Sequence, residues 1–487
     1  MSQHQPLPQI LAACKGVQQV FWSSAAAAPM GPDHEVFLGA DWPEPQPTTG
    51  SWADAARVTG VFQRLNARTW LRIAAAFDAW RASLGPDAAR VPWEAHRARW
   101  FAIAEAEFLR TQRSEPFLAA LADAVALAAR VLTSMQPEGR LALERMLKGA
   151  ALARRAVVSQ ALAGVEIANT PKHEIWRSGQ ISVSRYTPLN GITRLGPVLI
   201  CHGLIGRQTM TDLLPERSIV RQLLAAGCDV YVLDWGDAGP NEADLGTTMI
   251  TQSVLPGALD QVLGASGADR AVLMGICQGG TLAAIHAALD PSRLAGLITA
   301  VAPFDFTADE HDSDPAHGLL HLWTRAPAEA DLSAVLDASG NLPGDLMGLI
   351  FDQLNPAGTL AKYAVKLTES GDNPEELRLF LAMEAWLADR PDLPATLAKE
   401  WLIGLYRQNQ LADGALKVGG KTVDLSDLRL PVLNIMAAND HIVPPPCSRA
   451  LRRLAPAAQY QELTVPAGHI GAFVSSRAQA VMGPEII

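Results

Sequence analysis

The sequence predicts an α/β protein in which helices cover both faces of a mostly parallel sheet, preceded by an all-helical region. Five short apolar runs are typical of buried strands: "PVLIC" (197–201), "VYVLDW" (230–235), "AVLMG" (271–275), "LAGLITAVAP" (294–303) and "PVLNIMA" (431–437). Helical stretches separate several of them, and buried strands that alternate with helices form parallel sheets. "HEIWR" and "ISVSRY" before them indicate a paired β lead-in.

The region before the strands divides into two parts. Residues 1–50 contain turn formers without periodicity, so we expect a poorly ordered segment or linker. Residues 51–163 are expected to form a helical domain, with helices near 100–108, after a possible N-cap at Ser114, and over 138–162. Its first helix is indicated by large apolar residues at helical spacing: Phe62, Leu65, Trp70, Ile73, Phe77 and Trp80.

Residues 164–487 are expected to form the α/β domain. Between the strand that ends near Val301 and the one that begins at Pro431 lie about 125 residues of mostly helical pattern, too many for a simple crossover. The sequence therefore predicts a helical cap, inserted at about 305–428 over the carboxyl ends of the strands.

Size and charge narrow the function classes. A chain of 487 residues has room for two or three domains. Its net charge of −10 argues against a nucleic-acid partner, because binding to phosphates needs basic side chains gathered together. The five cysteines are scattered and include no C-x-x-C pair, which favours a reducing cytoplasm over a disulfide framework or a zinc site.

Two observations concern membranes. No uninterrupted apolar stretch of about 18 residues is present, so no transmembrane segment is predicted. The tetrapeptide LAAC at 11–14 has the form of a lipoprotein cleavage box, but the ten residues before it hold no Lys, no Arg and no apolar run. These residues are therefore interpreted as a plain N-terminal segment.

The stretch "LMGICQGGTL" (273–282) supplies a candidate nucleophile. Gly275, Cys277 and Gly279 have the G-x-S-x-G spacing of a nucleophile elbow, with a thiol in place of the hydroxyl. A strand precedes the cysteine and a helix follows it, and a helix N-terminus favours a thiolate. By itself the short motif fits a buried structural cysteine equally well.

Two later residues complete a candidate triad. Asp440 ends "LNIMAAND" after a late strand, and His469 lies in "VPAGHIGAF" after the strand "YQELTV". Each alone has an ordinary interpretation, as a turn aspartate and a solvated loop histidine. The order nucleophile, acid, histidine is that of the α/β-hydrolase fold, so the prediction becomes an α/β-hydrolase fold with a helical cap insertion.

The turn "ICHGLIG" (200–206) follows the first buried strand. Its position predicts an oxyanion site made by the backbone amides of Leu204 and Gln278. The alternative is a tight strand-to-helix turn without such a role. His202 and His441 stand beside these groups, and each either supports the site or only packs there.

Metal and cofactor sites are not predicted. The segment "ADEHDSDPAH" (308–317) gathers carboxylates and histidines, but it lacks ligand spacing and an apolar surround, so we expect a solvated loop. No G-x-G-x-x-G opens a helix and no Walker lysine is present, so no nucleotide cofactor is implied.

Several motifs together resemble polyhydroxyalkanoate (PHA) synthases, most closely the catalytic subunit of the two-subunit class III type. They are "TPKHEIWR", "MTDLLPERSIVRQLLAAGCDVYVLDWG", "GICQGG", "DASGNLPGDLMG", "MEAWLADRPD", "LNIMAANDHIVPP" and "GHIGAFVS". The resemblance implies Cys277 as the acylated nucleophile, His469 as its base, and Asp440 as the triad acid that also helps to activate the incoming hydroxyl. It implies polymerisation of a 3-hydroxyacyl-CoA, in particular 3-hydroxybutyryl-CoA, into polyester with release of CoA.

The resemblance also implies partners and a location. The helical region at 51–163 is similar to the accessory subunit of that class, fused here to the catalytic domain, although a separate accessory subunit is left open. A homodimer is implied, working in the cytoplasm at the surface of PHA granules with granule-associated proteins. One departure is "HGLIGRQ" (202–208), which is closer to ordinary hydrolases.

The chemistry of sulfur explains why this elbow would carry a cysteine. An acyl group moved from CoA to a thiol stays a thioester and keeps its activation, and a thiol is far more nucleophilic than a serine hydroxyl near neutral pH. The apolar cap would exclude water so that transfer outruns hydrolysis. Two alternatives stay open: a cysteine-dependent esterase, thioesterase or intracellular PHA depolymerase, and a non-catalytic granule-associated relative.

Overall fold

The computed structural model describes residues 76–84, 90–135, 166–189, 191, 193–310, 318–354, 358, 361–362, 370 and 373–486. The chain divides into two compact units. The N-terminal unit contains Met1–Lys148, Ala326–Val335 and Phe351–Leu381, and the sheet unit contains Gly149–Arg325, Leu336–Ile350 and Ala382–Ile487. The expectations for residues 1–50 and for a helix at 138–162 lie outside the described residues, and the domain boundaries inferred from the sequence stay predictions.

A mostly parallel sheet forms the centre of the sheet unit. Its strand order is β1–β2–β6–β3–β7–β8–β11–β12, parallel from β6 onwards, with β1 and β2 joined to it as an antiparallel hairpin. The strands are β1 (Lys172–Ser178), β2 (Ile181–Tyr186), β3 (Pro197–Cys201), β6 (Asp229–Asp234), β7 (Ala271–Ile276), β8 (Leu294–Ala300), β11 (Pro431–Ala437) and β12 (Gln459–Val465). Each apolar run named above lies on one of them, so the predicted sheet is confirmed.

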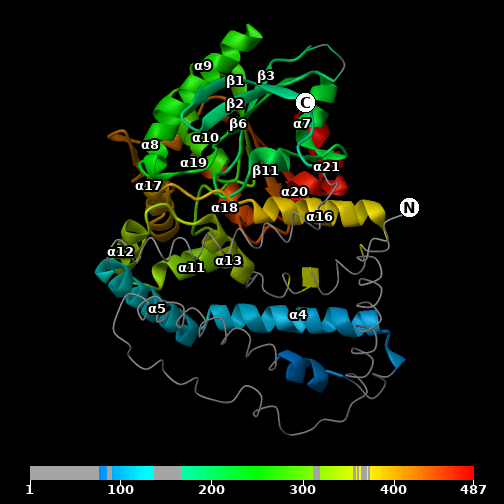
Figure 1. Ribbon diagram of the computed structural model, residues 1–487, viewed down its shortest axis with the longest axis vertical. Helices are drawn as coiled ribbons and strands as arrows, with labels where there is room; N and C mark the ends of the chain where they lie inside the picture. The colour runs from blue at the N-terminus through cyan, green and yellow to red at the C-terminus, as the bar shows by residue number, and fades with distance from the viewer. Residues whose placement is uncertain are drawn as a thin grey trace, which may run out of the picture. The chain divides into compact units, whose positions relative to one another are not determined.

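Helices cover both faces of this sheet (Figure 1). One face packs against α9 (Leu255–Ser266) and α10 (Gln278–Leu289), and the other packs against α7 (Ile219–Ala226) and α21 (Ser476–Ile486). This double covering explains why β3 is buried along its whole length and why its sequence is continuously apolar rather than alternating.

Shorter elements join the strands and helices of the sheet unit. They are η2 (Gln208–Thr211), β4 (Asp212–Leu214), β5 (Arg217–Ser218), η3 (Pro240–Glu242), α8 (Thr247–Met249), η4 (Ile250–Val254), β9 (Lys417–Val418), β10 (Lys421–Thr422), η7 (Leu425–Asp427), α18 (Pro445–Arg449), α19 (Leu451–Leu454) and α20 (Gly471–Val474).

The chain between β8 and β9 is helical over most of its described residues, as the sequence predicts for the cap. Its helices are α11 (Leu319–Arg325), α12 (Glu329–Ser339), α13 (Gly344–Leu354), α16 (Pro374–Ala388), α17 (Ala395–Lys399) and the π-helix η6 (Glu400–Arg407). Residues of α12, α13 and α16 are divided between the two units.

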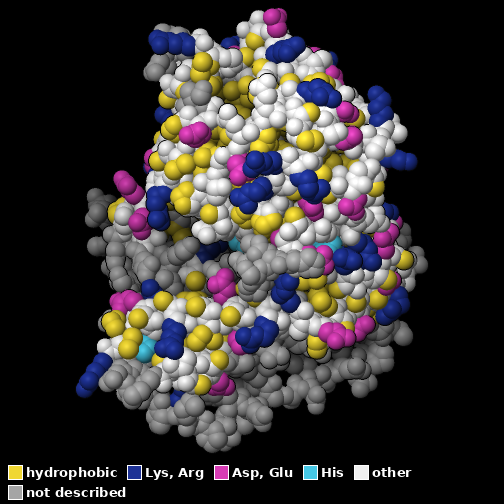
Figure 2. Space-filling view, turned by 180° about the vertical axis from the view of Figure 1, so that it is seen from behind, with side chains coloured by type: hydrophobic (Ala, Val, Ile, Leu, Met, Phe, Trp, Pro, Cys, Tyr) yellow, Lys and Arg dark blue, Asp and Glu magenta, His cyan; other side chains and the backbone are white. Residues whose placement is uncertain are grey.

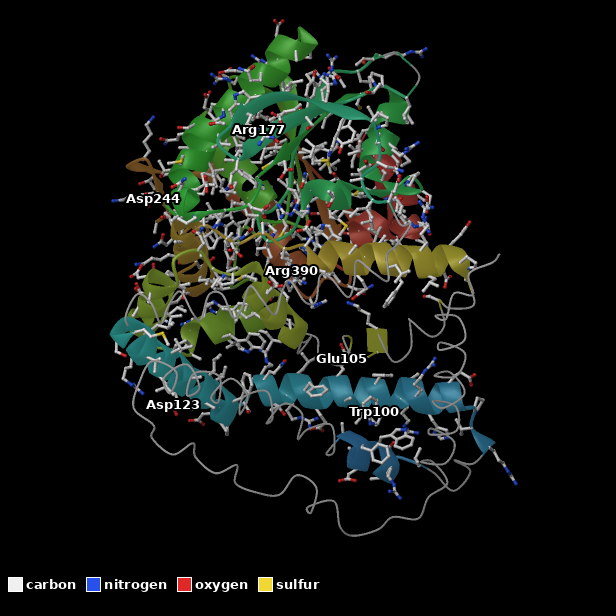
Figure 3. The ribbon with its side chains drawn as sticks, in the orientation of Figure 1. Trp100, Glu105, Asp123, Arg177, Asp244 and Arg390 are labelled. Atoms are coloured by element: carbon white, nitrogen blue, oxygen red, sulfur yellow. The ribbon has the colours of Figure 1, made fainter. Side chains whose placement is uncertain are left out.

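In the N-terminal unit, α4 (Trp93–Gln112) and α5 (Glu115–Ser134) are the long described helices. Trp100 projects from α4 toward the helical residues 76–82, where it joins a buried cluster with Trp80 (Figure 3). Ser114 is the N-cap residue of α5, as predicted, but its hydroxyl donates to the carbonyl of Thr111 instead of capping a helix amide.

Helix α5 is more apolar than the sequence reading implied. By length and composition it could cross a membrane, with a mean hydropathy of 1.6 over 18 residues, of which 28% are buried. Asp123 lies near its middle (Figure 3), and a carboxylate there would cost about 2.5 to 3.5 kcal/mol in a bilayer. One such helix is weak evidence for a membrane span, since the core helices of many globular proteins pass the same test.

The face seen in Figure 2 carries Lys and Arg interspersed with Asp and Glu among the described residues. Among the described residues in this view, charges of the two signs are mixed and not separated by sign.

Candidate active site

Cys277 is the single residue between a strand and a helix. Strand β7 ends at Ile276 and helix α10 begins at Gln278, so the cysteine occupies the turn itself, with φ of 53°. Its carbonyl accepts the amide of Gly280 at 2.9 Å, and its side chain is only partly buried. The predicted elbow is therefore present, with the thiol raised to the carboxyl edge of the sheet.

Two residues with strained backbone, Cys277 and Val301, lie at this edge of the sheet. A positive φ in a residue other than glycine costs about 1 to 3 kcal/mol. Val301, directly after β8, also has a positive φ of 46°, which is rare for a β-branched residue. The Cys277 amide donates to the Ala300 carbonyl at 2.9 Å, so the two strained turns are tied together.

Three glycines allow the strand and helix to approach so closely. A β-carbon on Gly275 would lie 2.4 Å from the Gly280 Cα, and one on Gly279 would lie 2.1 Å from the Cys201 carbonyl oxygen. A β-carbon on Gly280 would lie 2.5 Å from the Ala302 Cβ. The sequence motif identified Gly275 and Gly279, but the requirement at Gly280 comes from Ala302, just beyond the end of β8, which the motif does not include.

His469 and Asp440 form a buried pair beyond the ends of β11 and β12. The Nδ1 atom of His469 lies 2.7 Å from Oδ2 of Asp440, whose side chain is fully buried. The other carboxylate oxygen accepts the amides of Ile442 and Val443, both at 2.9 Å. Because a carboxylate only accepts, Nδ1 carries the proton and Nε2 is left for another partner.

The Cys277 thiol is near enough to this imidazole to affect its titration. Burial by itself lowers the pKa of His469, but the charge of Asp440, the charge of Cys277 and hydrogen bonds to both raise this pKa well above its ordinary value. The structure thus brings the three candidate residues together from three strand ends. This arrangement places a basic imidazole near the sulfur at the elbow.

The turn after β3 lies against the start of α10. A β-carbon on Gly203 would lie 3.4 Å from the Gln278 amide nitrogen and 3.5 Å from the Cys277 Cβ. The Leu204 amide, expected as an oxyanion donor, donates to Oε1 of the Gln278 side chain at 3.1 Å. Both predicted amides are therefore next to the thiol, and the one from Leu204 is already engaged by an internal oxygen.

His202 supports this turn from inside. Its Nδ1 lies 2.9 Å from the Gly203 carbonyl oxygen, and its own carbonyl accepts the indole NH of Trp235 at 2.8 Å. Burial lowers the pKa of His202 to about 4. The ring is therefore neutral near pH 7 and donates from Nδ1.

We expect His202 to make the folded protein sensitive to acid. Its folded-state pKa lies below the unfolded value of 6.5, so its contribution is intact above pH 6.5 and is lost as the pH falls toward 4. The difference corresponds to about 3 kcal/mol in the free energy of unfolding. Urea unfolding at pH 6.5, 5.5 and 4.5 measures this loss.

The matched variant is His202→Asn, which keeps a donor for Gly203 but has no proton to gain. Its free energy of unfolding should decline less than that of the wild type over the same pH range. Equal declines in the two proteins would contradict this role of His202.

Residues of α16 close over the turn from the cap side. The indole NH of Trp386 donates to the Arg207 carbonyl at 2.8 Å, and its ring lies so close to Gly206 that a β-carbon there would be 2.5 Å away. Arg207 also pairs with Asp389 at 3.2 Å. These contacts hold a cap helix against the segment that follows the predicted oxyanion turn.

The remaining candidates lie on the other side of the cysteine. His441 is half-buried and lines a small cavity. Asp309, expected in a solvated loop, is instead buried, and its carboxylate accepts the Gly318 amide; residues 311–317 of that segment lie outside the described residues. Within the described part of the chain, no group of three or more His, Cys, Asp or Glu could hold a metal ion.

Comparison with known proteins agrees with this fold. The α/β-hydrolase fold family matches residues 196–476. Among solved structures, an α/β-hydrolase fold protein from Nakamurella multipartita is 17% identical, with a TM-score of 0.37 over 65% of this chain and 97% of that one.

Closer relatives are polymerases. The poly(3-hydroxyalkanoate) polymerase subunit PhaC of Allochromatium vinosum is 35% identical over 321 residues, which cover 65% of this chain and 87% of that protein. The PhaC subunit of Thiocystis violacea is 34% identical over 65% of this chain and 87% of its own length. That of Synechocystis is 32% identical, over 66% and 84%. The chain therefore belongs to the α/β-hydrolase fold family and, within it, to the poly(3-hydroxyalkanoate) polymerases of the PhaC type.

Proposed function

We propose that this protein polymerises 3-hydroxyacyl groups from CoA thioesters into a polyester, with 3-hydroxybutyryl-CoA as a substrate and free CoA as the second product. The observation that carries the proposal is the strained turn that presents the Cys277 thiol to His469, with Asp440 behind the imidazole. The family membership supports the same reaction class.

In the first step, His469 takes the thiol proton and the Cys277 sulfur attacks the thioester carbonyl carbon. The negative charge that develops on the carbonyl oxygen is stabilised by the amides of Leu204 and Gln278. When the carbon–sulfur bond to CoA breaks, His469 returns the proton to the departing CoA sulfur. One thioester is consumed and one is formed, so the acyl group stays activated.

In the second step, the hydroxyl of another hydroxyacyl unit attacks the acyl-enzyme. Its proton passes to His469 while the new ester bond forms and the Cys277 sulfur leaves, taking the proton back. Asp440 holds Nδ1 of the imidazole in both steps, so that Nε2 always faces the reacting atoms. Exclusion of water by the cap contacts at Trp386 favours the hydroxyl over hydrolysis.

The wider assembly is part of this proposal. Residues 51–163 take the place of a separate accessory subunit, and the protein acts as a homodimer at the surface of cytoplasmic polyester granules. If so, the purified chain should elongate polymer without an added subunit.

The decisive experiment is incubation of the purified protein with 3-hydroxybutyryl-CoA, following CoA release and insoluble polymer together. Polymer formed in proportion to CoA supports the proposal. Release of CoA with free 3-hydroxybutyrate and no polymer would instead identify a thioesterase, the alternative favoured by the hydrolase-like turn at 202–208.

A further inference from the structure

A small cavity lies beside the candidate triad, within the sheet unit. Its volume is about 20 Å³, which is room for one water molecule. It is bounded by the chain after β8, the chain after β11 and the cap helices. Its polar lining residues among the described part of the chain are Asp309, His321, Tyr406, His441 and Cys447.

Tyr406 is held firmly at this cavity. Its ring meets that of Phe306 edge-on, with centroids 4.8 Å apart, and that of Trp401 at 6.5 Å. Its carbonyl accepts Nδ1 of His321 at 2.7 Å, and Arg325 donates to the other ring nitrogen of this histidine at 2.9 Å. A guanidinium only donates, so His321 must donate from Nδ1.

The π-helix that carries Tyr406 is itself anchored. Glu400, its first residue, accepts both the amide and the hydroxyl of Thr247 at 2.7 Å. Single π-turns are unusual within helices and are frequent at functional sites. The phenol is therefore placed by contacts at both ends of η6.

The hydroxyl of Tyr406 makes no hydrogen bond with the described residues, although it belongs to a residue that lines the cavity. Burial raises the pKa of Tyr406 well above its ordinary value, and the nearby Cys277, Cys447, Asp309 and Asp440 raise it further. The phenol thus stays protonated at any physiological pH and can both donate and accept.

The sheet order places this phenol opposite the predicted oxyanion turn. Cys277 follows β7, the turn follows β3 on one side of β7, and the cavity adjoins the ends of β8 and β11 on the other side. Consider an acyl group bound to the Cys277 sulfur with its carbonyl oxygen in the oxyanion turn, on the β3 side. The rest of that acyl group then extends toward the β8 side, where the cavity lies.

We propose that the Tyr406 hydroxyl binds the 3-hydroxyl of the acyl group and so selects hydroxyacyl over unsubstituted acyl thioesters. The inference rests on the function proposed above. A substrate hydroxyl has the size of the water that the cavity admits, and it would give the Tyr406 hydroxyl a hydrogen-bond partner that the described residues do not supply. An acyl group without a 3-hydroxyl leaves the cavity empty and the phenol without a hydrogen-bond partner.

The test compares wild type and Tyr406→Phe in single-turnover acylation, with enzyme in excess over 3-hydroxybutyryl-CoA or butyryl-CoA and CoA release as the readout. The variant should acylate about three- to tenfold more slowly with the hydroxylated substrate, the usual effect of one lost hydrogen bond. With butyryl-CoA its acylation rate should stay within about twofold of wild type. The ratio of the rate with 3-hydroxybutyryl-CoA to the rate with butyryl-CoA should therefore fall.

Tyr460→Phe is the matched control, because it removes a phenol that binds Asn434 in the sheet unit and should leave the preference unchanged. The free energy of unfolding of Tyr406→Phe should equal that of wild type, since the lost hydroxyl has no bond to give up. A preference that survives in Tyr406→Phe, or equal slowing with both substrates, overturns the inference while the proposed function stands. A wild type that releases no CoA from either thioester overturns both.

Discussion

Replacement of Cys277 by alanine should abolish CoA release from 3-hydroxybutyryl-CoA, with a loss on the order of 10⁴-fold or more. The thiol is the only atom at the elbow that can accept the acyl group, and His469 and Asp440 have no proton to move without it. Alanine fits the same turn, so the free energy of unfolding should change by less than about 1 kcal/mol. CoA release is followed by chromatography, because thiol reagents would also react with the protein.

Cys277→Ser is the companion variant. A serine keeps the turn and the hydrogen-bond geometry but forms an oxygen ester, which is less activated than a thioester toward the next hydroxyl. We expect it to turn over far more slowly than wild type, with acyl-enzyme detectable by mass spectrometry. Polymerisation by Cys277→Ala at the wild-type rate would show that Cys277 is not the nucleophile.

Replacement of Gly279 by alanine should unfold or strongly destabilise the protein. In a helix, alanine is normally favoured over glycine by about 1 kcal/mol. Here the added β-carbon would lie 2.1 Å from the Cys201 carbonyl oxygen and 2.8 Å from the His202 carbonyl, which are backbone atoms of a central strand end that cannot swing aside. The clash outweighs helix propensity, and we expect a loss of about 3 kcal/mol or more in the free energy of unfolding.

Gly264→Ala is the control for this prediction. Gly264 lies within α9, and a β-carbon there would meet no atom within 4 Å. This change should raise the free energy of unfolding by about 0.5 to 1 kcal/mol, as expected from helix propensity, and so move the urea midpoint slightly upward. If Gly279→Ala unfolds at the same urea concentration as wild type, the close approach of β3 to α10 is not required for stability.

The parts of the fold that depend on local pattern were predictable from the sequence. Strands β3 and β7 are buried on both faces, so their composition is apolar throughout, and α10 follows β7 because glycines at 275 and 279 mark the turn. The candidate triad was inferred by the same logic, since each of its members comes shortly after a predicted strand. Helix α5 was predicted as a helix, but its high mean hydropathy was not noted, because Glu115, Asp123 and Arg130 interrupt its apolar sequence.

The contacts made by the cap were not predictable in this way. Trp386 and Tyr406 read as ordinary members of apolar helices, and only the folded chain brings them to Gly206 and to the cavity near Asp440. Their partners lie between about 30 and 180 residues away along the chain, beyond the reach of any spacing rule. The requirement for glycine at position 280 was missed for the same reason, because it is imposed by Ala302 on a neighbouring strand end.

The hydrogen bond between the Leu204 amide and the Gln278 side chain should make this amide bind an oxyanion in preference to a neutral carbonyl oxygen. A neutral carbonyl oxygen that enters the turn replaces another neutral amide oxygen, so the exchange gains almost nothing. An oxygen that has become an anion forms a bond roughly twice as strong and displaces the side chain with a net gain. The Leu204 amide would then stabilise the tetrahedral adduct more than the bound thioester. Selective stabilisation of this kind lowers the activation free energy.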